Sequence, residues 1–429
     1  MRKMMFRAYH AVTGVAYWSE RTFTAAGMLV LAAAILSGVF GIDTTQSTAY
    51  RMFSFLVVLL GIALVGQRWR RGRFAVERML PRAATSGESF EYRLRIKNLS
   101  QAEAQSLSLR DELADPRPDY PQFSAAMKWP SYRGWLRLIE RNRVGRVALS
   151  GIGKLAPGAV IEVRMSAQAL RRGRMHFTGV RVGCHEVLGL ARGLATVALA
   201  QNLIVLPRRY MLPPLALPGG RRYQQGGVTL ASSVGDSEEF IGLRDYRPGD
   251  PLQRVHWKSF ARLGHPVVRE YQDEYFERYA LILDTFAAAS EAEAFEEAVA
   301  VAASFACTID TQECMLDLMF VGALPYTYTA GRGQLQAGSL LEVLAGVELC
   351  EDKPFSVLAA ALAARAAGLS GGVCVLLGWD RARADLIDQL RARGALLRVL
   401  CISKKPIVEA PPWLTQLVPG RVQEGLAAL

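Results

Sequence analysis

The sequence FTAAGMLVLAAAILSGVFGI, from Phe23 to Ile42, contains no charged residue. An α-helix needs about 20 such residues to cross the ~30 Å hydrocarbon core of a bilayer. A second apolar run, MFSFLVVLLGIALVG from Met52 to Gly66, follows after a short polar connection. We therefore predict a two-helix transmembrane hairpin over residues 23–66, after an N-terminal segment over residues 1–22. The alternative for the first run is a cleavable signal peptide, but its apolar core is too long and no small-residue cleavage site precedes the second run.

Basic residues around the two runs predict how the hairpin lies in the membrane. The connection between the runs carries only Asp43 and Arg51 as charged residues. The flanking basic residues are Arg2, Lys3, Arg7 and Arg21 before the first run, and Arg68, Arg70, Arg71 and Arg73 after the second. By the positive-inside rule, both ends of the hairpin face the cytoplasm, so both termini are expected there.

Composition agrees with a membrane protein. The chain of 429 residues is 51% hydrophobic and 21% charged, and its net charge is +12. Because part of that charge clusters beside the apolar runs, it favours a membrane surface over nucleic acid. The six cysteines are scattered without a Cys-x-x-Cys pair, so we expect reduced thiols and no metal site built on them.

After the hairpin, the hydrophobic period changes to that of β-strands. Apolar and charged residues alternate from Phe90 to Lys97, which predicts a half-buried strand. Similar patterns continue, and we predict an antiparallel, sandwich-like all-β domain over residues 74–207. Within it, the segment from Pro116 to Leu138 is rich in proline and aromatic residues. This segment is either a loop folded over its own sheet or a surface that meets the bilayer or a partner.

The C-terminal part alternates strand and helix patterns. Residues 208–278 are rich in proline and glycine at their start and are interpreted as a linker that carries a signature motif. From residue 279 to 429 the succession predicts a doubly wound α/β domain with a parallel sheet. The predicted strands are Tyr279–Leu283, Met315–Val321, Val373–Leu377 and Leu396–Ile402, and a predicted helix spans Arg383–Arg393.

The signature motif lies in the segment GDSEEFIGLRDYRPGDPLQRVHWKSFARLGH, from Gly235 to His265. Pro248 and Gly249 form a turn that places Asp250 as the N-cap of a helix ending at Gly264. Arg254, Lys258 and Arg262 recur every fourth residue, which predicts one basic stripe along that helix.

These residues strongly resemble the bacterial family called domain of unknown function 58. The hallmark of that family reads approximately F-x-x-L-R-x-Y-x-P-G-D-x-x-R-x-I-D-W-K-x-S-A-R. The matching positions here are Phe240, Leu243, Arg244, Tyr246, Pro248, Gly249, Asp250, Trp257, Lys258, Ala261 and Arg262, and Arg254 lies one position after the arginine of the hallmark. The sequence departs from the family at His256, where an aspartate is usual, and at His185-Glu186-Val187.

The resemblance implies a fold and partners for the C-terminal part. The family's C-terminal domain is similar to von Willebrand factor type A domains, and its members often accompany MoxR-type AAA+ ATPases. A partner of that kind and a multi-pass location in the bacterial inner membrane are therefore implied. A type A metal site needs Asp-x-Ser-x-Ser, whereas here Asp284 is followed by Phe286 and Ala288 at the serine positions. Asp380 is a further carboxylate at the same expected sheet edge, and we predict no bound metal.

No phosphate loop, dinucleotide turn, zinc motif or nucleophile elbow is present, so no catalytic residue and no cofactor are predicted. We interpret Arg244, Tyr246, Pro248, Gly249, Asp250 and Trp257 as structural, and Arg254, Lys258 and Arg262 as partner-binding. The leading hypothesis is a non-enzymatic membrane scaffold or adaptor for protein–protein interaction. The alternatives are a metal-assisted hydrolase or ligand-binding enzyme using Asp284 and Asp380, and a protein whose basic and aromatic segments mainly bind anionic lipid.

Overall fold

The computed structural model describes residues 1–429 except 41–46, 70–71, 128, 186–187, 214–239, 272–276, 310–313, 323, 331–334, 366–368 and 408–409. The chain forms two compact units. The first comprises residues 1–208 with the short stretch 344–346, and the second comprises the rest of residues 209–429.

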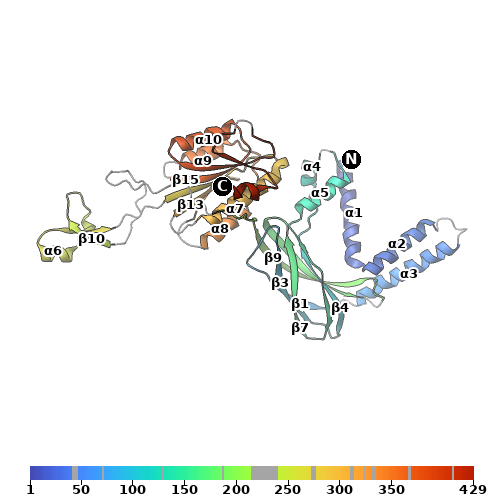
Figure 1. Ribbon diagram of the computed structural model, residues 1–429. Coiled ribbons are helices and arrows are strands. Elements are labelled where there is room, and N and C mark those ends of the chain that lie inside the picture. Colours follow the sequence, from blue (N-terminus) through green and yellow to red (C-terminus); the bar gives the residue numbers. More distant parts are fainter. Residues whose placement is uncertain are drawn as a thin grey trace. The chain divides into compact units, whose positions relative to one another are not determined.

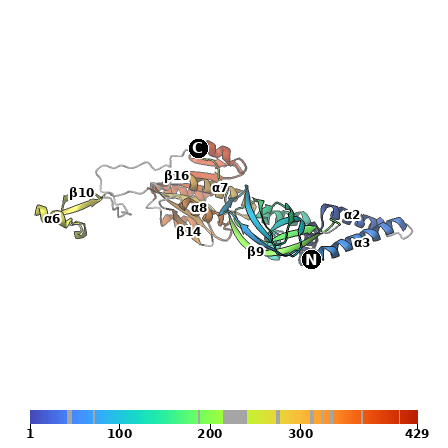
Figure 2. The ribbon, with the colours of Figure 1, turned by 90° about the horizontal axis from the view of Figure 1, so that it is seen from below.

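Three helices begin the first unit: α1 (Arg2–Thr22), α2 (Ala25–Phe40) and α3 (Ser47–Trp69). Helices α2 and α3 lie side by side (Figures 1 and 2) and share a small apolar cluster that includes Ala34, Leu60 and Ala63. The stretch Thr48–Gln67 of α3 has 20 residues and a mean hydropathy of 2.0, so its length and composition suffice to cross a bilayer. Helix α2 is apolar but shorter, at 16 residues. The predicted connection at residues 41–46 lies outside the described residues.

The start of α2 is attached to the β-rich domain. Phe23 forms an isolated β-bridge with Ala191, and the Thr24 amide donates a 3.0 Å hydrogen bond to the Leu190 carbonyl. A Cβ atom at Gly27 would lie 2.0 Å from that carbonyl oxygen. Glycine is therefore required here, because any side chain would push α2 away from the domain.

Two sheets form the β-rich domain, and among their described strands only the β2–β9 pair is parallel. The first sheet has the order β1 (Phe74–Met79), β3 (Ser89–Asn98), β7 (Val160–Ala169), β5 (Gly145–Val147). The second has the order β2 (Ala83–Thr85), β9 (Arg192–Leu206), β8 (Gly173–His185), β4 (Ala104–Leu113), β6 (Ser150–Leu155).

A common core joins the two sheets, as the alternating pattern predicts. Tyr92, Leu94 and Ile96 of β3 are buried, and they belong to the same apolar cluster as Phe177 and Val180 of β8. Burying a side chain of this size contributes about 1.5–3 kcal/mol. The charged neighbours along β3 stay on the exposed face.

The aromatic segment at residues 116–138 is not a loop over the sheet. It contains α4 (Tyr120–Ala126) and the start of α5 (Tyr132–Asn142), and both pack with α1. Phe123 and Trp135 are fully buried, with Phe6 of α1 packed against both rings. The prediction missed this arrangement because aromatic residues that face another helix look, in the sequence, like an interfacial loop.

The second unit contains the α/β domain. Its six-stranded sheet has the order β14 (Pro325–Ala330), β13 (Cys314–Val321), β12 (Glu277–Leu283), β15 (Gly371–Leu377), β16 (Leu396–Ile402), β17 (Leu414–Leu417). All described pairs are parallel except β13 with β14 at the edge. The four predicted strands are confirmed.

Helices cover both faces of this sheet. Helix α7 (Ala292–Thr308) contacts β12 and β15. Helices α9 (Ser356–Ala363) and α10 (Arg381–Ala392) pack with the alternate side chains of the same strands, such as Ile282 and Cys374. The chain here also forms helices α8 (Leu335–Ala345) and α11 (Val422–Ala427). Strands buried on both faces explain the nearly continuous apolar sequence of β15.

Candidate functional site: the signature module and the edge of the α/β sheet

The signature motif folds into a small hairpin module, defined here as residues 240–271. Strands β10 (Phe240–Asp245) and β11 (Val267–Tyr271) pair antiparallel. Their connection holds a 3₁₀ turn, Leu252–Arg254, and the short helix α6 (Trp257–Leu263). The module thus occupies much of the segment that the sequence suggested as a linker.

An ion pair closes the turn after β10. The Arg244 guanidinium donates to both carboxylate oxygens of Asp250, at 2.7 Å and 2.8 Å, in the two-pronged geometry that makes arginine–carboxylate pairs strong. The backbone amide of Arg247 donates to the same carboxylate at 2.8 Å. Gly249 has φ +109°, which favours glycine. Asp250 therefore closes this loop, whereas we predicted it as a helix N-cap.

The predicted continuous helix from Pro251 to Leu263 is wrong. Val255 leaves helical geometry to form a β-bridge with Val268, and the His256 amide donates to the Val267 carbonyl at 2.8 Å. Because of this break, Arg254 is on the 3₁₀ turn, while Lys258 and Arg262 are on α6. The three basic side chains are all exposed, but they do not form one helical stripe. Gly264 ends α6 with φ +76°, as predicted.

Helix α6 exposes apolar side chains as well as basic ones. Trp257 is 62% exposed and Leu263 is 56% exposed. The rings of Trp257 and Phe260 stack edge to face at 6.0 Å. On a helix, these three residues share one side, and Lys258 and Arg262 lie on another. Trp257 was predicted to be structural, but its exposed indole adds it to the partner-binding candidates.

The other structural candidates lie within the hairpin module. The Tyr246 amide donates to the Pro266 carbonyl at 3.0 Å, which continues the pairing beyond β10 and β11. Pro248 is exposed at the turn. These positions fit a role in shaping the turn rather than in chemistry.

The ion pair with Arg244 should shift the pKa of Asp250 by a measurable amount. The hydrogen bonds from the Arg244 guanidinium and the Arg247 amide lower the pKa of Asp250 to about 2. A pKa below the ordinary value means that the pair stabilises the folded module above pH ~4 and that this contribution is lost as the pH falls through about 2. Replacing Arg244 with glutamine should raise this pKa towards its ordinary value.

A carboxyl-carbon NMR titration, assigned with Asp250→Asn, measures that shift. Arg269→Gln, which removes an exposed arginine of the same module, serves as the control and should leave the midpoint unchanged. An Asp250 midpoint that stays low in Arg244→Gln would contradict the assigned cause.

His256 occupies the N-cap position of α6, where the resembling family has aspartate. Its ring Nδ1 lies 2.7 Å from the Ser259 hydroxyl, and its side chain does not cap the helix. An aspartate accepts backbone N–H bonds at an N-cap, so His256→Asp should stabilise α6 by about 0.5–2 kcal/mol. Hydrogen exchange of the α6 amides would report slower exchange, whereas His256→Ala should give no gain. Equal exchange rates in His256→Asp and His256→Ala would refute the capping argument.

Asp284 and Asp380 meet at the carboxyl edge of the α/β sheet, and an arginine lies with them. Asp284 is fully buried just after β12, and it accepts hydrogen bonds from the backbone amides of Phe286 and Leu377, each at 2.9 Å. The Arg383 Nε donates to the same carboxylate at 2.7 Å, and its Nη1 donates to Asp380. The positive charge between the two carboxylates is therefore supplied by a side chain of this protein.

Arg383 also contacts a backbone carbonyl and an aromatic ring. Its Nη2 donates to the Phe286 carbonyl at 2.9 Å, and its guanidinium lies 4.9 Å from the centre of the Phe355 ring. Asp380 also caps α10 by accepting from the Arg383 amide at 2.9 Å. Sequence reasoning missed Arg383 because it considered carboxylates and hydroxyls as metal ligands and did not search for a cation within the chain.

Buried thiols lie behind this edge. Burial raises the pKa of Cys374 and of Cys401 to about 12, so both thiols remain protonated at neutral pH. In the described part of the chain, five cysteines are outside any disulfide bond, namely Cys184, Cys307, Cys350, Cys374 and Cys401.

The signature module and most of the α/β domain match a known family. Residues 242–402 fit the family model described as "Protein of unknown function DUF58". The curated protein "Uncharacterized protein YeaD" from Bacillus subtilis (strain 168) is 31% identical over 135 residues. That alignment covers 31% of this chain and 32% of the relative, so the match spans about a third of the relative's length.

Solved structures give only distant similarities. The CARDB domain of the PF1109 protein from Pyrococcus furiosus matches with a TM-score of 0.18 and 11% identity, over 32% of this chain and 90% of that chain. A FixG-related protein from Vibrio parahaemolyticus matches with a TM-score of 0.17 and 14% identity, over 31% of this chain and 95% of that chain. TM-scores of this size do not define a shared fold.

Proposed function

We propose that the protein is a non-enzymatic scaffold or adaptor of the bacterial inner membrane, which presents a von Willebrand factor type A-like domain to a protein partner. In this proposal α2 and α3 form the transmembrane hairpin. The span Thr48–Gln67 supports it, as do the many outward apolar side chains of both helices, such as Leu29 and Val58 at 73% and 60% exposure. Basic residues on the flanks of both helices support the proposal that the two termini face the cytoplasm.

The type A-like assignment is supported by the parallel strands of the α/β sheet and by the position of Asp284. This aspartate follows β12, where type A domains begin their metal motif. Arg383 between Asp284 and Asp380 favours a role in stability over metal-assisted hydrolysis, because a buried guanidinium already balances these carboxylates.

The observation that carries the proposal is the exposed face of the signature module. Trp257, Phe260 and Leu263 supply apolar area on α6, and Lys258 and Arg262 supply adjacent positive charge. Aromatic and arginine side chains are the residues that most often dominate the energy of protein interfaces. This combination suits an acidic protein surface with an apolar pocket, and a MoxR-type AAA+ ATPase is the first candidate.

Charge reversal tests this face. In the variant Arg254→Glu, Lys258→Glu, Arg262→Glu, recovery of the partner from solubilised membranes should fall about tenfold or more. The reason is that charges of the same sign facing each other across an interface cost several kcal/mol. The matched control reverses Arg93, Arg95 and Lys97 on the exposed face of β3, with the same change in net charge. Quantitative mass spectrometry of co-purified proteins measures both. Equal recovery in the two variants would refute the proposal that this face binds the partner.

A further inference from the structure

A cavity of about 840 Å³ lies within the first unit, between α1, β4, β5 and β8. Its size falls within the roughly 300–1,000 Å³ typical of small-molecule sites. Gln67, at the end of the apolar stretch of α3, lines the same cavity. Neither the predicted partner face nor the α/β sheet contributes to it.

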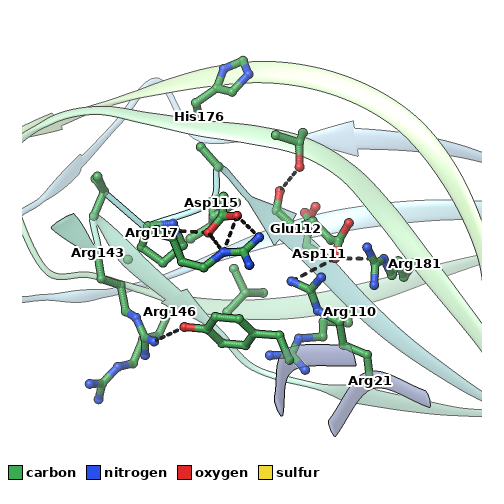
Figure 3. A pocket seen from close by; sticks show the side chains of 18 of the residues that line it. Arg21, Arg110, Asp111, Glu112, Asp115, Arg117, Arg143, Arg146, His176 and Arg181 are labelled. Carbon is green, nitrogen blue, oxygen red and sulfur yellow. Dashed lines mark hydrogen bonds and ion pairs between the residues drawn. The ribbon is translucent and has the colours of Figure 1, made fainter. Parts of the chain in front are cut away.

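Positive charge dominates the lining of this cavity. Seven arginines and four carboxylates line it. Figure 3 labels most of them around the space. Two of the carboxylates already have partners. Asp111 accepts from Arg78 and from the Tyr92 hydroxyl, and Asp115 accepts from Arg117. Arg117 itself belongs to the lining, and Glu140 pairs with Arg143 and Arg146, so the lining keeps an excess of positive charge after these pairs are counted.

Part of this excess of positive charge lies around the carboxylate of Glu112. The Arg181 Nε lies 2.8 Å from one oxygen of Glu112, and an Arg21 Nη lies 3.6 Å from the same oxygen. The Nε atoms of Arg21 and Arg181 are buried and have no hydrogen-bond acceptor among the described residues. Burial lowers the pKa of Arg181, and the nearby charges of Arg21 and Arg110 act in the same direction. Two guanidinium groups thus lie against one carboxylate, and the charge of a third, Arg110, acts on Arg181.

Such an arrangement has the chemistry of an oxyanion site. Guanidinium groups bind phosphate oxygens through paired, charge-assisted hydrogen bonds, and a phosphate offers enough oxygens for three arginines at once. Tyr17 and Trp18 of α1 line the same cavity, and they provide apolar surface for an organic group attached to the phosphate.

We propose that this cavity binds the phosphate group of an anionic ligand through Arg21, Arg110 and Arg181. The ligand is either a membrane lipid with a phosphate headgroup or a soluble phosphorylated compound. The position of Gln67 favours the lipid, and that preference alone rests on the proposed membrane hairpin. Phosphate binding itself is independent of the scaffold proposal, because it is measured without any protein partner.

Isothermal titration calorimetry on the full chain in a neutral detergent, at constant ionic strength, tests the site. The probes are inorganic phosphate, short-chain phosphatidic acid and short-chain phosphatidylcholine. We expect phosphate or phosphatidic acid to bind with a Kd below about 1 mM. Phosphatidic acid binding about tenfold or more tighter than phosphate identifies a lipid headgroup, and equal affinities identify a soluble phosphate compound.

Variants connect binding to the named arginines. Arg181→Gln and Arg21→Gln should each weaken binding about tenfold or more, while Arg181→Lys should retain part of it. Arg93→Gln, on the exposed face of β3, is the control and should bind like the wild type. An unchanged melting temperature shows that a variant is folded. If Arg181→Gln does not fold, Arg110→Gln is tested in its place. Absence of binding by both anionic probes, or equal binding by the wild type and all folded variants, overturns the proposal.

Discussion

Replacing Asp284 with alanine is expected to lower the free energy of unfolding of the α/β domain by about 3–5 kcal/mol. The carboxylate is fully buried and accepts from Arg383 and from two backbone amides. Its removal leaves the guanidinium of Arg383, only 9% exposed, without its most deeply buried partner. An unbalanced buried charge costs far more than the pair itself contributes.

Hydrogen exchange of β15 and β16 in the full chain measures this loss for the α/β domain alone. Asp380→Ala is the matched comparison, because this side chain is 53% exposed and its loss removes mainly a helix cap worth about 0.5–2 kcal/mol. The double variant Asp284→Ala, Arg383→Met should be more stable than Asp284→Ala, since it removes the stranded charge. Unchanged exchange in Asp284→Ala would show that the buried contacts carry no such energy.

An equally large loss, about 3–5 kcal/mol, is expected in the β-rich domain for Asp111→Ala. The Arg78 and Asp111 side chains are both 0% exposed, and two hydrogen bonds join them. The Tyr92 hydroxyl donates to the same carboxylate at 2.8 Å. The Arg78 guanidinium also lies 4.7 Å from the centre of the Phe177 ring, in the middle of the core. Removal of Asp111 therefore leaves a buried positive charge without its counter-ion and a hydroxyl without its acceptor.

Exchange of the β3 and β8 amides is the corresponding measurement. The control is Arg95→Met, which breaks an ion pair with Glu162 on the exposed face of β3 and should cost no more than about 1 kcal/mol. If Asp111→Ala and Arg95→Met raised exchange equally, burial would not be what gives the Arg78–Asp111 pair its energy.

Much of the architecture could be predicted from local patterns. The alternation around Tyr92, Leu94 and Ile96 reports burial on one face of a strand, and the continuous apolar run of β15 reports burial on both. The apolar run in α3 likewise reports a helix long enough for a bilayer. Each of these features depends on residues close together in the chain, so the sequence alone suffices.

Local patterns failed where a distant strand changed the backbone. Arg254, Lys258 and Arg262 have helical spacing, yet pairing of Val255 with Val268 on β11 breaks the helix between them. The aromatic segment near Trp135 is helical because α1 packs against it. The sequence of the segment does not indicate which element it packs against. A backbone hydrogen bond to another strand outweighs the small preference of a few residues for a helix.

The sequence by itself determined which segments are apolar helices, which are strands with one buried face, and where the signature turn lies. Only the tertiary structure decided which charges meet: Asp284 with Arg383, Asp111 with Arg78, and Glu112 with Arg21 and Arg181. The physical reason is that periodicity records the burial of each residue, whereas these pairs depend on strand order and register across the sheets. Residues far apart in the chain meet only after the strands have paired.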